Sequence, residues 1–154
     1  MGERRRSTAS FEVLRTTGSS DALDRLFVYA TLRQGQTARS LIAHQIAKAV
    51  PATTSGTIYA FPMGYGGFLE AAEPRGCGAP RVIGELVWLN ELPATLGLLD
   101  AYEGPEFARV IRQVQLETGE SLWSWIYVLA DPDAIKHGTP IEHGDWVRYC
   151  SEQP

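Results

Sequence analysis

Glu103 is the residue of this sequence whose type and position best suit chemistry. It lies in the segment LDAYEG, residues 99–104, near the end of a predicted short helix. A carboxylate held in a pocket can take a proton from one group and return it to another, which accelerates a reaction about 10²- to 10⁴-fold. A lone glutamate at a helix end is also a common cap or ion-pair partner, so a structural role stays open. The turn at residues 29–33, after the first apolar run, is the second place of interest.

Other kinds of catalytic site have little support. No serine or cysteine lies in a GxSxG elbow or in another recognisable nucleophile motif. Cys77 and Cys150 form no CxxC pair, and the three histidines lie apart in the sequence. We therefore expect no metal site, and we interpret the cysteines as unlinked thiols in a reducing compartment. The GYGG run at residues 64–67 lacks the strand and helix that flank a phosphate-binding loop.

The bulk properties indicate one ordinary globular domain. The chain has 154 residues, of which 44% are hydrophobic and 21% charged, so it needs neither disulfides nor a metal to fold. Its net charge of −4 and the absence of a basic stripe argue against nucleic acid as a partner. No apolar run reaches the roughly 20 residues that cross a bilayer, and no apolar core follows Arg4, Arg5 and Arg6. We expect a cytoplasmic protein without a membrane partner.

The first half of the chain predicts strands around one helix. Residues 1–24 are predicted to be a flexible N-terminal extension and residues 25–150 the folded domain. Residues 26–29 are typical of a buried strand, and residues 37–47 have helical spacing. Strand pieces are expected at residues 49–50 and 57–61, around Pro51 and Gly56. Residues 62–80 carry five glycines and three prolines, which predicts a loop, best placed as a flexible wall beside a pocket.

The second half predicts a strand, a helix and a hairpin. Residues 82–89 form the strand, Asn90 caps the helix, and Leu92, Leu96 and Leu99 line its apolar side up to Tyr102. Strands at 108–116 and 122–129 are joined by the turn ETGE, and the second should be covered on both faces. Residues 130–154 are predicted to be a tail with one polar turn at 143–146. This order predicts an α+β fold with a mixed sheet, curled into a small barrel.

Six short motifs follow one another in an order that resembles a known family. They are FVYATLR (27–33), GELVW (84–88), LDAYEG (99–104), EFAR (106–109), WIY (125–127) and GDW (144–146). These are similar to V-Y-G-[ST]-L-R, G-E-[LV]-[YW], L-D-x-x-E-G, E-Y-x-R, W-x-Y and G-D-W of the γ-glutamylcyclotransferase-like superfamily. The chain is identified as a member of it on the order of all six.

The resemblance implies a fold, an activity and a site. The fold is a small mixed β-barrel with flanking short helices. The activity is cyclisation of a γ-glutamyl amine or amide, releasing 5-oxoproline and a free amine without metal or organic cofactor. Glu103 matches the family's general acid/base. The implied substrate-binding residues are Tyr29, Ala30, Thr31, Leu32, Arg33 and Tyr127, the first five mainly through backbone amides.

Two positions depart from the motifs, and several others have structural alternatives. Ala30 stands where the family has glycine; if this position needs a positive φ, the methyl group is unfavourable by about 1 kcal/mol. Phe107 stands where tyrosine is common. Arg33 and Arg109 would more commonly be solvated or paired charges, and Glu85 is as well suited to an ion pair as to a site. A non-catalytic member that binds a metabolite or a protein partner in the same pocket is the alternative function.

Overall fold

The computed structural model describes residues 23–71 and 79–154. The predicted N-terminal extension lies outside the described residues, apart from its last two positions, as does the middle of the predicted glycine-rich loop. Leu23, the first described residue, is buried. No helix in these two ranges combines the length and apolar character needed to cross a membrane.

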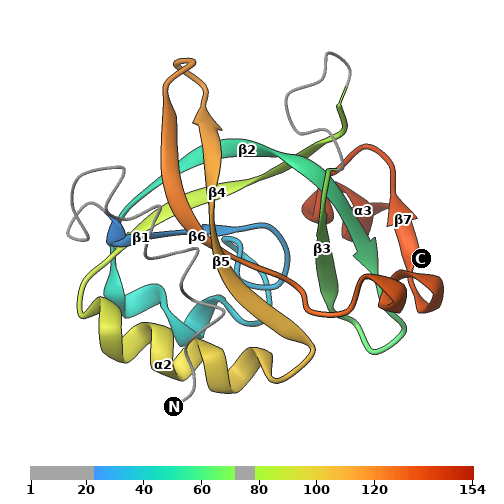
Figure 1. The fold of residues 1–154 in the computed structure, drawn as a ribbon, viewed down its shortest axis with the longest axis horizontal. Helices are drawn as coiled ribbons and strands as arrows, with labels where there is room; N and C mark the ends of the chain where they lie inside the picture. Colours follow the sequence, from blue (N-terminus) through green and yellow to red (C-terminus); the bar gives the residue numbers. More distant parts are fainter. Residues whose placement is uncertain (1–22, 72–78) are drawn as a thin grey trace.

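Five strands close into a barrel, as the sequence predicts (Figure 1). They are β1 Arg25–Val28, β2 Ile46–Ala60, β4 Arg81–Leu89, β5 Phe107–Leu116 and β6 Ser121–Leu129. Their order is β2-β4-β1-β6-β5, and β5 pairs back to β2. The β1–β6 pair is parallel and the others are antiparallel, so the sheet is mixed. The expected α+β barrel is confirmed, and so is the β5–β6 hairpin.

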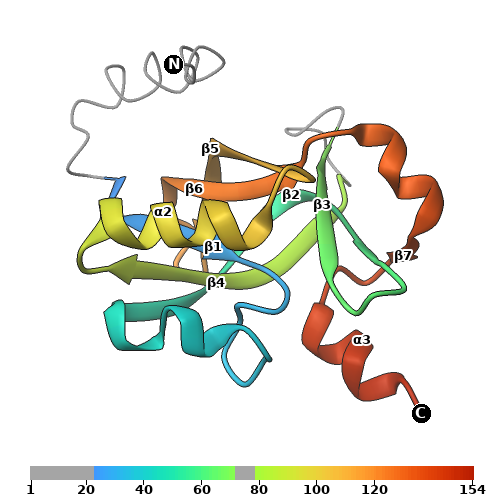
Figure 2. The ribbon, with the colours of Figure 1, turned by 90° about the horizontal axis from the view of Figure 1, so that it is seen from below.

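Shorter elements surround the barrel. Strands β3 (Gly66–Glu70) and β7 (Thr139–Ile141) pair with the far end of β2, beyond the barrel. Helix α2 (Leu92–Glu103) crosses β1, and α3 (Trp146–Glu152) lies beside β3 and β7 (Figures 1 and 2). Three 3-10 segments complete the described elements: η3 Arg39–Leu41, η4 Ala43–Gln45 and η5 Pro132–His137.

The helix expected at residues 37–47 is wrong. The chain forms the two 3-10 turns η3 and η4 there, and β2 begins at Ile46. The backbone bonds run from residue i to i−3, as in Leu41 N to Ala38 O at 3.0 Å. Ala38 and Ile42 are nevertheless buried. The apolar spacing therefore predicted the burial of these two side chains correctly. It did not distinguish an α-helix from 3-10 turns, which bury the same positions.

Strand β2 runs without a break through Pro51, where two separate pieces were expected. β2 has partners on both sides only from Ala52 onward, so Pro51 lies where one side is unpaired and a sheet tolerates proline. At Gly56, with φ of 151°, β2 leaves β4 and begins to pair with β3. The prediction of a loop over residues 62–80 is also wrong in part, because this segment contains β3.

The second helix and the C-terminal segment also differ from expectation. Helix α2 is preceded by Glu91 in the left-handed conformation (φ 48°) rather than capped by Asn90, and Pro93 occupies its first turn. The helix ends at Glu103, one residue beyond Tyr102. The predicted tail contains η5, β7 and α3. Asp145, inside the predicted polar turn, caps α3 by accepting hydrogen bonds from the Val147 and Arg148 N–H groups.

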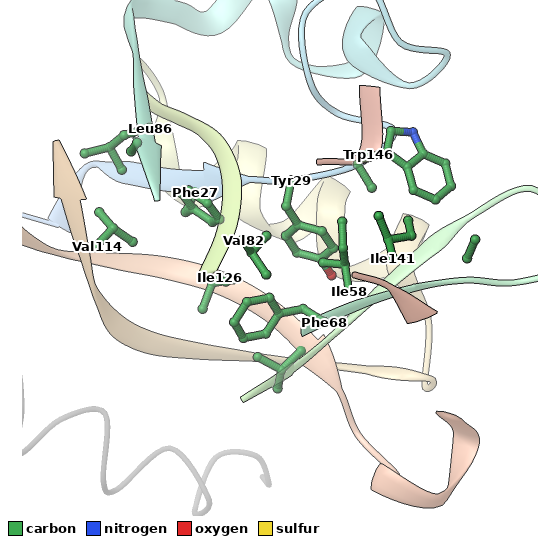
Figure 3. Packing of buried hydrophobic residues seen from close by; sticks show 14 residues of the cluster. Phe27, Tyr29, Ile58, Phe68, Val82, Leu86, Val114, Ile126, Ile141 and Trp146 are labelled. Carbon is green, nitrogen blue, oxygen red and sulfur yellow. The ribbon is translucent and has the colours of Figure 1, made fainter. Parts of the chain in front are cut away.

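The core explains why the run at residues 26–29 is apolar. Phe27 and Tyr29, the residue that follows β1, point into the barrel (Figure 3). The ring centroids of Tyr29 and Phe68 are 5.6 Å apart there. Leu26 and Val28 point outward into a second cluster, which α2 and the 32–42 segment cover. Strand β6 is likewise packed on both faces, as predicted: Ile126 and Val128 lie inside the barrel, whereas Tyr127 and Trp125 lie in the outer cluster. The turn after β1 and the end of α2 are thereby fixed close together.

Candidate active site

A pocket of about 450 Å³ opens between the turn after β1 and the end of α2. Its wall comes from four parts of the chain: β1 with its turn, the β2–β3 connection, the end of α2 with the start of β5, and β6. The lining residues are Phe27, Val28, Tyr29, Ala30, Thr31, Leu32, Met63, Tyr65, Gly66, Tyr102, Glu103, Glu106, Phe107 and Tyr127. The structure therefore brings Glu103 together with five of the six predicted substrate-binding residues.

Glu103 faces the pocket because it continues the buried side of α2. Leu96 and Leu99 are buried, and Glu103 follows Leu99 by four residues, which places it on the same face. Gly104, with φ of 77°, ends the helix immediately afterwards. Glu103 is partly buried, and no hydrogen bond or ion pair from a described residue reaches its carboxyl group. The carboxyl group is therefore free to meet a ligand.

The surroundings of Glu103 shift its proton affinity toward neutral pH. Burial and, as the smaller cause, the nearby negative charge of Asp100 together raise the pKa of Glu103 from 4.5 to about 7. The pKa of Tyr29 is raised by its burial and then by the charge of Glu103. A carboxyl group with a pKa near 7 can exchange a proton in either direction at neutral pH.

Asp100 is held in place by two donors. Arg109 binds it through both Nε and Nη2, at 2.9 and 3.0 Å, and the Tyr127 hydroxyl donates to it at 2.6 Å. Burial alone would raise the pKa of Asp100, but these hydrogen bonds outweigh it and leave the pKa below its usual range. Asp100 thus stays charged while Glu103 becomes easier to protonate. The Arg109 guanidinium also lies 4.4 Å from the Trp125 ring centroid.

The turn after β1 lines the pocket and contains backbone N–H groups that other backbone groups do not bind. The carbonyl oxygens of Ala30, Thr31 and Leu32 accept hydrogen bonds from the Arg33 N–H, the Ala38 N–H and the Arg39 side chain, at 3.0, 2.9 and 3.2 Å. Within the described residues, the N–H groups of Thr31 and Leu32 have no protein acceptor. Successive unpaired N–H groups of this kind form a small anion-binding concavity.

Arg33 does not line the pocket. Its side chain binds Asp145 at 2.8 Å and lies 3.6 Å from Glu85, while its backbone N–H donates to the Ala30 carbonyl. Glu85 also binds Arg39 at 2.6 Å and accepts from the Gln34 N–H at 3.2 Å. Arg33 and Glu85 are therefore ion-pair members that fasten the turn to β4 and α3. Arg109 is likewise a paired charge.

Ala30 is accommodated without backbone strain. Among the described non-glycine residues only Glu91 has a positive φ, so residue 30 does not need glycine for its conformation. The Ala30 methyl group lies against Gly66, where an added Cβ would come within 2.9 Å of it and 3.0 Å of the Trp146 ring. The chain thus compensates for the methyl group at position 30 by having glycine at position 66.

Several pocket residues were not anticipated individually. Met63, Tyr65 and Gly66 line the pocket from the segment predicted as a loop wall, and β3 holds the last of them. Glu106 is a second carboxylate in the lining. Glu106 belongs to the EFAR motif, but nothing in that motif indicated that its side chain lines the pocket. In the described part of the chain no three His, Cys, Asp or Glu side chains cluster as metal ligands.

One of the comparisons with known proteins shows the family. The family model described as "Gamma-glutamyl cyclotransferase, AIG2-like" matches residues 26–148. A comparison with curated proteins gives no match. Three solved structures show the same fold. The first, YkqA from Bacillus subtilis, is 22% identical with a TM-score of 0.62 over 85% of this chain, which spans only 44% of YkqA.

The other two structures are closer in length. The protein c4763 from uropathogenic E. coli is 17% identical, with a TM-score of 0.61 over 85% of this chain and 98% of its own. An AIG2-like protein from Mus musculus is 25% identical, with a TM-score of 0.54 over 86% of this chain and 91% of its own. The family match covers most of the chain, including every residue that lines the pocket. This chain belongs to the gamma-glutamyl cyclotransferase, AIG2-like family.

Proposed function

We propose that this protein is a γ-glutamyl cyclotransferase that converts a γ-glutamyl amine or amide into 5-oxoproline and a free amine. One observation carries the proposal: a carboxyl group with a pKa near 7, Glu103, lines the same pocket as the unpaired N–H groups of Thr31 and Leu32. A proton carrier and an anion-stabilising turn are the two parts that an intramolecular amide cyclisation needs.

The substrate supplies its own nucleophile in this reaction. Its α-amine nitrogen attacks the γ-carbonyl carbon, the new C–N bond closes a five-membered lactam, and the original bond to the leaving nitrogen breaks. Two of the three protons of the α-ammonium group end on the leaving nitrogen, which departs as an ammonium ion, and no water is consumed. Holding the chain folded supplies much of the rate, because effective molarities of oriented groups reach about 10⁵ M or more.

The chain's residues would divide the work between proton transfer and charge stabilisation. Deprotonated Glu103 takes a proton from the attacking amine and returns it to the leaving nitrogen. The N–H groups of Thr31 and Leu32 bind the carbonyl oxygen as it becomes negative. Loss of one such donor typically costs about 3 kcal/mol in the transition state.

The test is an assay for 5-oxoproline with a panel of γ-glutamyl amino acids and γ-glutamyl amines. Glu103→Gln should lower kcat by about 10²- to 10⁴-fold, since the amide cannot carry the proton. Glu117→Gln is the matched control, because it makes the same chemical change in the exposed β5–β6 turn and should leave kcat unchanged. Full activity in Glu103→Gln would refute the mechanism.

The alternative, a non-catalytic member that uses the pocket only for binding, makes a different prediction. Its purified wild-type protein would bind γ-glutamyl compounds in calorimetry and release no 5-oxoproline from any of them. The unpaired Glu103 carboxyl group with its raised pKa favours the catalytic function, because a binding site alone gains nothing from a group poised to exchange protons.

A cytoplasmic location also belongs to the proposal. Cys150 is an exposed free thiol, which suits a reducing compartment. Subcellular fractionation with an antibody against the native protein tests this. Recovery of the protein in an oxidising compartment would contradict it.

A further inference from the structure

The turn that contains the Thr31 and Leu32 N–H groups belongs to no regular element. Within the described chain, residues 29–38 form neither helix nor strand, so no ladder of hydrogen bonds fixes the direction of these two donors. A trans peptide unit is planar, and its C=O and N–H groups point in opposite directions. The groups that hold the Ala30 and Thr31 carbonyls therefore also set the direction of the two N–H groups.

The groups that hold these carbonyls lie a few residues further along the same segment. The Ala30 carbonyl accepts a hydrogen bond from the Arg33 N–H at 3.0 Å. The Thr31 carbonyl accepts one from the Ala38 N–H at 2.9 Å. The direction of the two donors thus depends on where residues 33–38 are held.

Glu85 fastens this segment to strand β4. Its carboxylate binds the Arg39 side chain at 2.6 Å and accepts a hydrogen bond from the Gln34 N–H at 3.2 Å. Arg39 in turn donates to the Leu32 carbonyl at 3.2 Å. The side chains of Glu85 and Arg39 are each only 16% exposed, so solvent and salt weaken this ion pair less than a pair on the surface.

Asp145, at the start of α3, is the second anchor of the segment. It binds the Arg33 side chain at 2.8 Å, and that side chain is only 13% exposed. The start of α3 is itself attached to β4, because the Gly144 carbonyl accepts a hydrogen bond from the Ile83 N–H at 2.8 Å. Asp145 therefore joins the turn to the sheet by a second path.

We propose that Asp145 and Glu85 are positioning residues for the reaction. Acting through the two arginines that they bind, they hold the turn in the geometry that the oxyanion requires. Neither residue lines the pocket, so neither touches the substrate. The inference rests on the proposed function and adds to it the residues that keep its N–H donors in place. A displacement of about 1 Å in such a group can lower a rate about 10²-fold.

Asp145→Asn separates positioning from helix capping. Asparagine caps a helix as well as aspartate does, so α3 keeps its first turn, whereas the charge that binds Arg33 is lost. Among the described residues Arg33 then has only Glu85 as an anionic partner, and Glu85 already binds Arg39. We expect kcat for 5-oxoproline release to fall about 10- to 100-fold with KM nearly unchanged, because the oxyanion forms only in the transition state.

Glu85→Gln tests the second anchor, and it should also lower kcat with KM nearly unchanged. Two matched variants serve as controls. Asp131→Asn makes the same change at the cap of η5, and Glu70→Gln breaks the ion pair with Arg112. Neither control residue lines the pocket, so both variants should keep the wild-type kcat. Urea unfolding verifies that each variant is folded in the assay, and either anchor variant by itself decides the inference.

Two kinetic readouts distinguish positioning from a general loss of structure. Burial and Asp100 cause the raised pKa of Glu103, so the acidic limb of kcat/KM should stay near pH 7 in both anchor variants. The second readout is a double-mutant cycle on kcat. Arg33→Met and the double variant Arg33→Met/Asp145→Asn should have the same kcat, because Asp145 acts through Arg33.

A measurement without substrate tests the geometry of the turn directly. In nitrogen-15 relaxation, the Thr31 and Leu32 amides of the wild type should have order parameters of about 0.85, typical of rigid backbone. In Asp145→Asn and Glu85→Gln these values should fall toward about 0.6. The Val147 amide, which the residue at 145 still caps, should keep its wild-type value.

The outcomes separate this inference from the function on which it rests. If the wild type releases 5-oxoproline and both anchor variants keep its kcat, the positioning role is wrong and the cyclotransferase function stands. Unchanged order parameters at Thr31 and Leu32, or additive losses of kcat at positions 33 and 145, would likewise overturn it. If the wild type releases no 5-oxoproline from any member of the panel, the proposed function fails and the inference fails with it.

Discussion

The Tyr127 hydroxyl donates a hydrogen bond to Asp100 over 2.6 Å, and this contact joins strand β6 to helix α2 one turn before Glu103. Arg109 holds the same carboxylate from β5. The β5–β6 hairpin thus keeps a negative charge at a fixed place beside Glu103. Burial and that charge together raise the pKa of Glu103 to about 7.

The pH dependence of kcat/KM should show this pKa. If Glu103 acts as the base, kcat/KM rises with pH as Glu103 loses its proton, with an acidic limb near pH 7. Asp100→Asn removes the negative charge, so the pKa of Glu103 falls and the limb moves toward lower pH. The midpoint of the acidic limb should stay above pH 4.5, because Glu103 remains partly buried in the variant. Measurement of kcat/KM between pH 4.5 and 9 for both proteins checks this.

A control fixes the interpretation of that shift. Asp133→Asn makes the same change at an exposed position that does not line the pocket, and its profile should coincide with that of the wild type. The substrate's own amine titrates identically with all three proteins. An unmoved limb in Asp100→Asn would show that Asp100 does not influence the catalytic proton.

The raised pKa also makes a prediction about stability. Folded Glu103 holds its proton up to about pH 7, whereas in the unfolded chain it loses the proton near pH 4.5, so the free energy of unfolding decreases as pH rises between these values. Glu103→Gln removes this loss and should be the more stable protein at pH 8. The loss in the free energy of unfolding over the full pH interval is at most about 3 kcal/mol, and solvent access to the carboxyl group makes this loss smaller. Urea unfolding at pH 8 and pH 4.5 should show the difference shrinking at the lower pH.

Tyr29 has a structural role that can be measured separately from substrate binding. Its hydroxyl donates to the Tyr127 carbonyl at 2.7 Å inside the core. Tyr29→Phe removes this buried hydrogen bond and should lower the free energy of unfolding by about 0.5 to 1.5 kcal/mol. Tyr59→Phe is the control, because the Tyr59 hydroxyl has no protein partner in the described ranges; it should change stability by less than about 0.5 kcal/mol. Equal effects of the two changes would contradict the importance of the buried bond.

Gly66 and Ala30 should behave as a coupled pair. Gly66→Ala would place a Cβ 2.9 Å from the Ala30 methyl group and 3.0 Å from the Trp146 ring, and should destabilise the fold by about 1 to 3 kcal/mol. Adding Ala30→Gly should restore part of this loss, which a double-mutant cycle of urea unfolding measures. Gly97→Ala, with open space around it in α2, should instead stabilise by about 0.5 to 1 kcal/mol. Additive effects at positions 30 and 66 would show that the two side chains do not compete for space.

Local patterns determined the parts of the fold that depend on neighbours in the sequence. The apolar run at residues 26–29, the hairpin turn at 117–120 and the stripe Leu96–Leu99 predicted their elements correctly, because burial and turn formation act there over a few residues. The same local reasoning failed at residues 37–47, where 3-10 turns bury the same side chains as a helix would. It also missed β3, since a glycine-rich strand has no apolar alternation to reveal it.

Sequence alone placed Glu103 at the end of a short helix and Tyr29 at the end of the first strand, and it ordered the motifs that surround them. Only the tertiary structure decided that Glu103 is partly buried and unpaired, that Asp100 is fixed by Tyr127, and that Arg33 turns away to Asp145, 112 residues along the chain. It also brought Met63 and Glu106 to the mouth of the same pocket. The physical reason is common to all of these. A residue's charge state and free hydrogen-bonding groups depend on what covers it, and here the covering residues come from distant parts of the sequence.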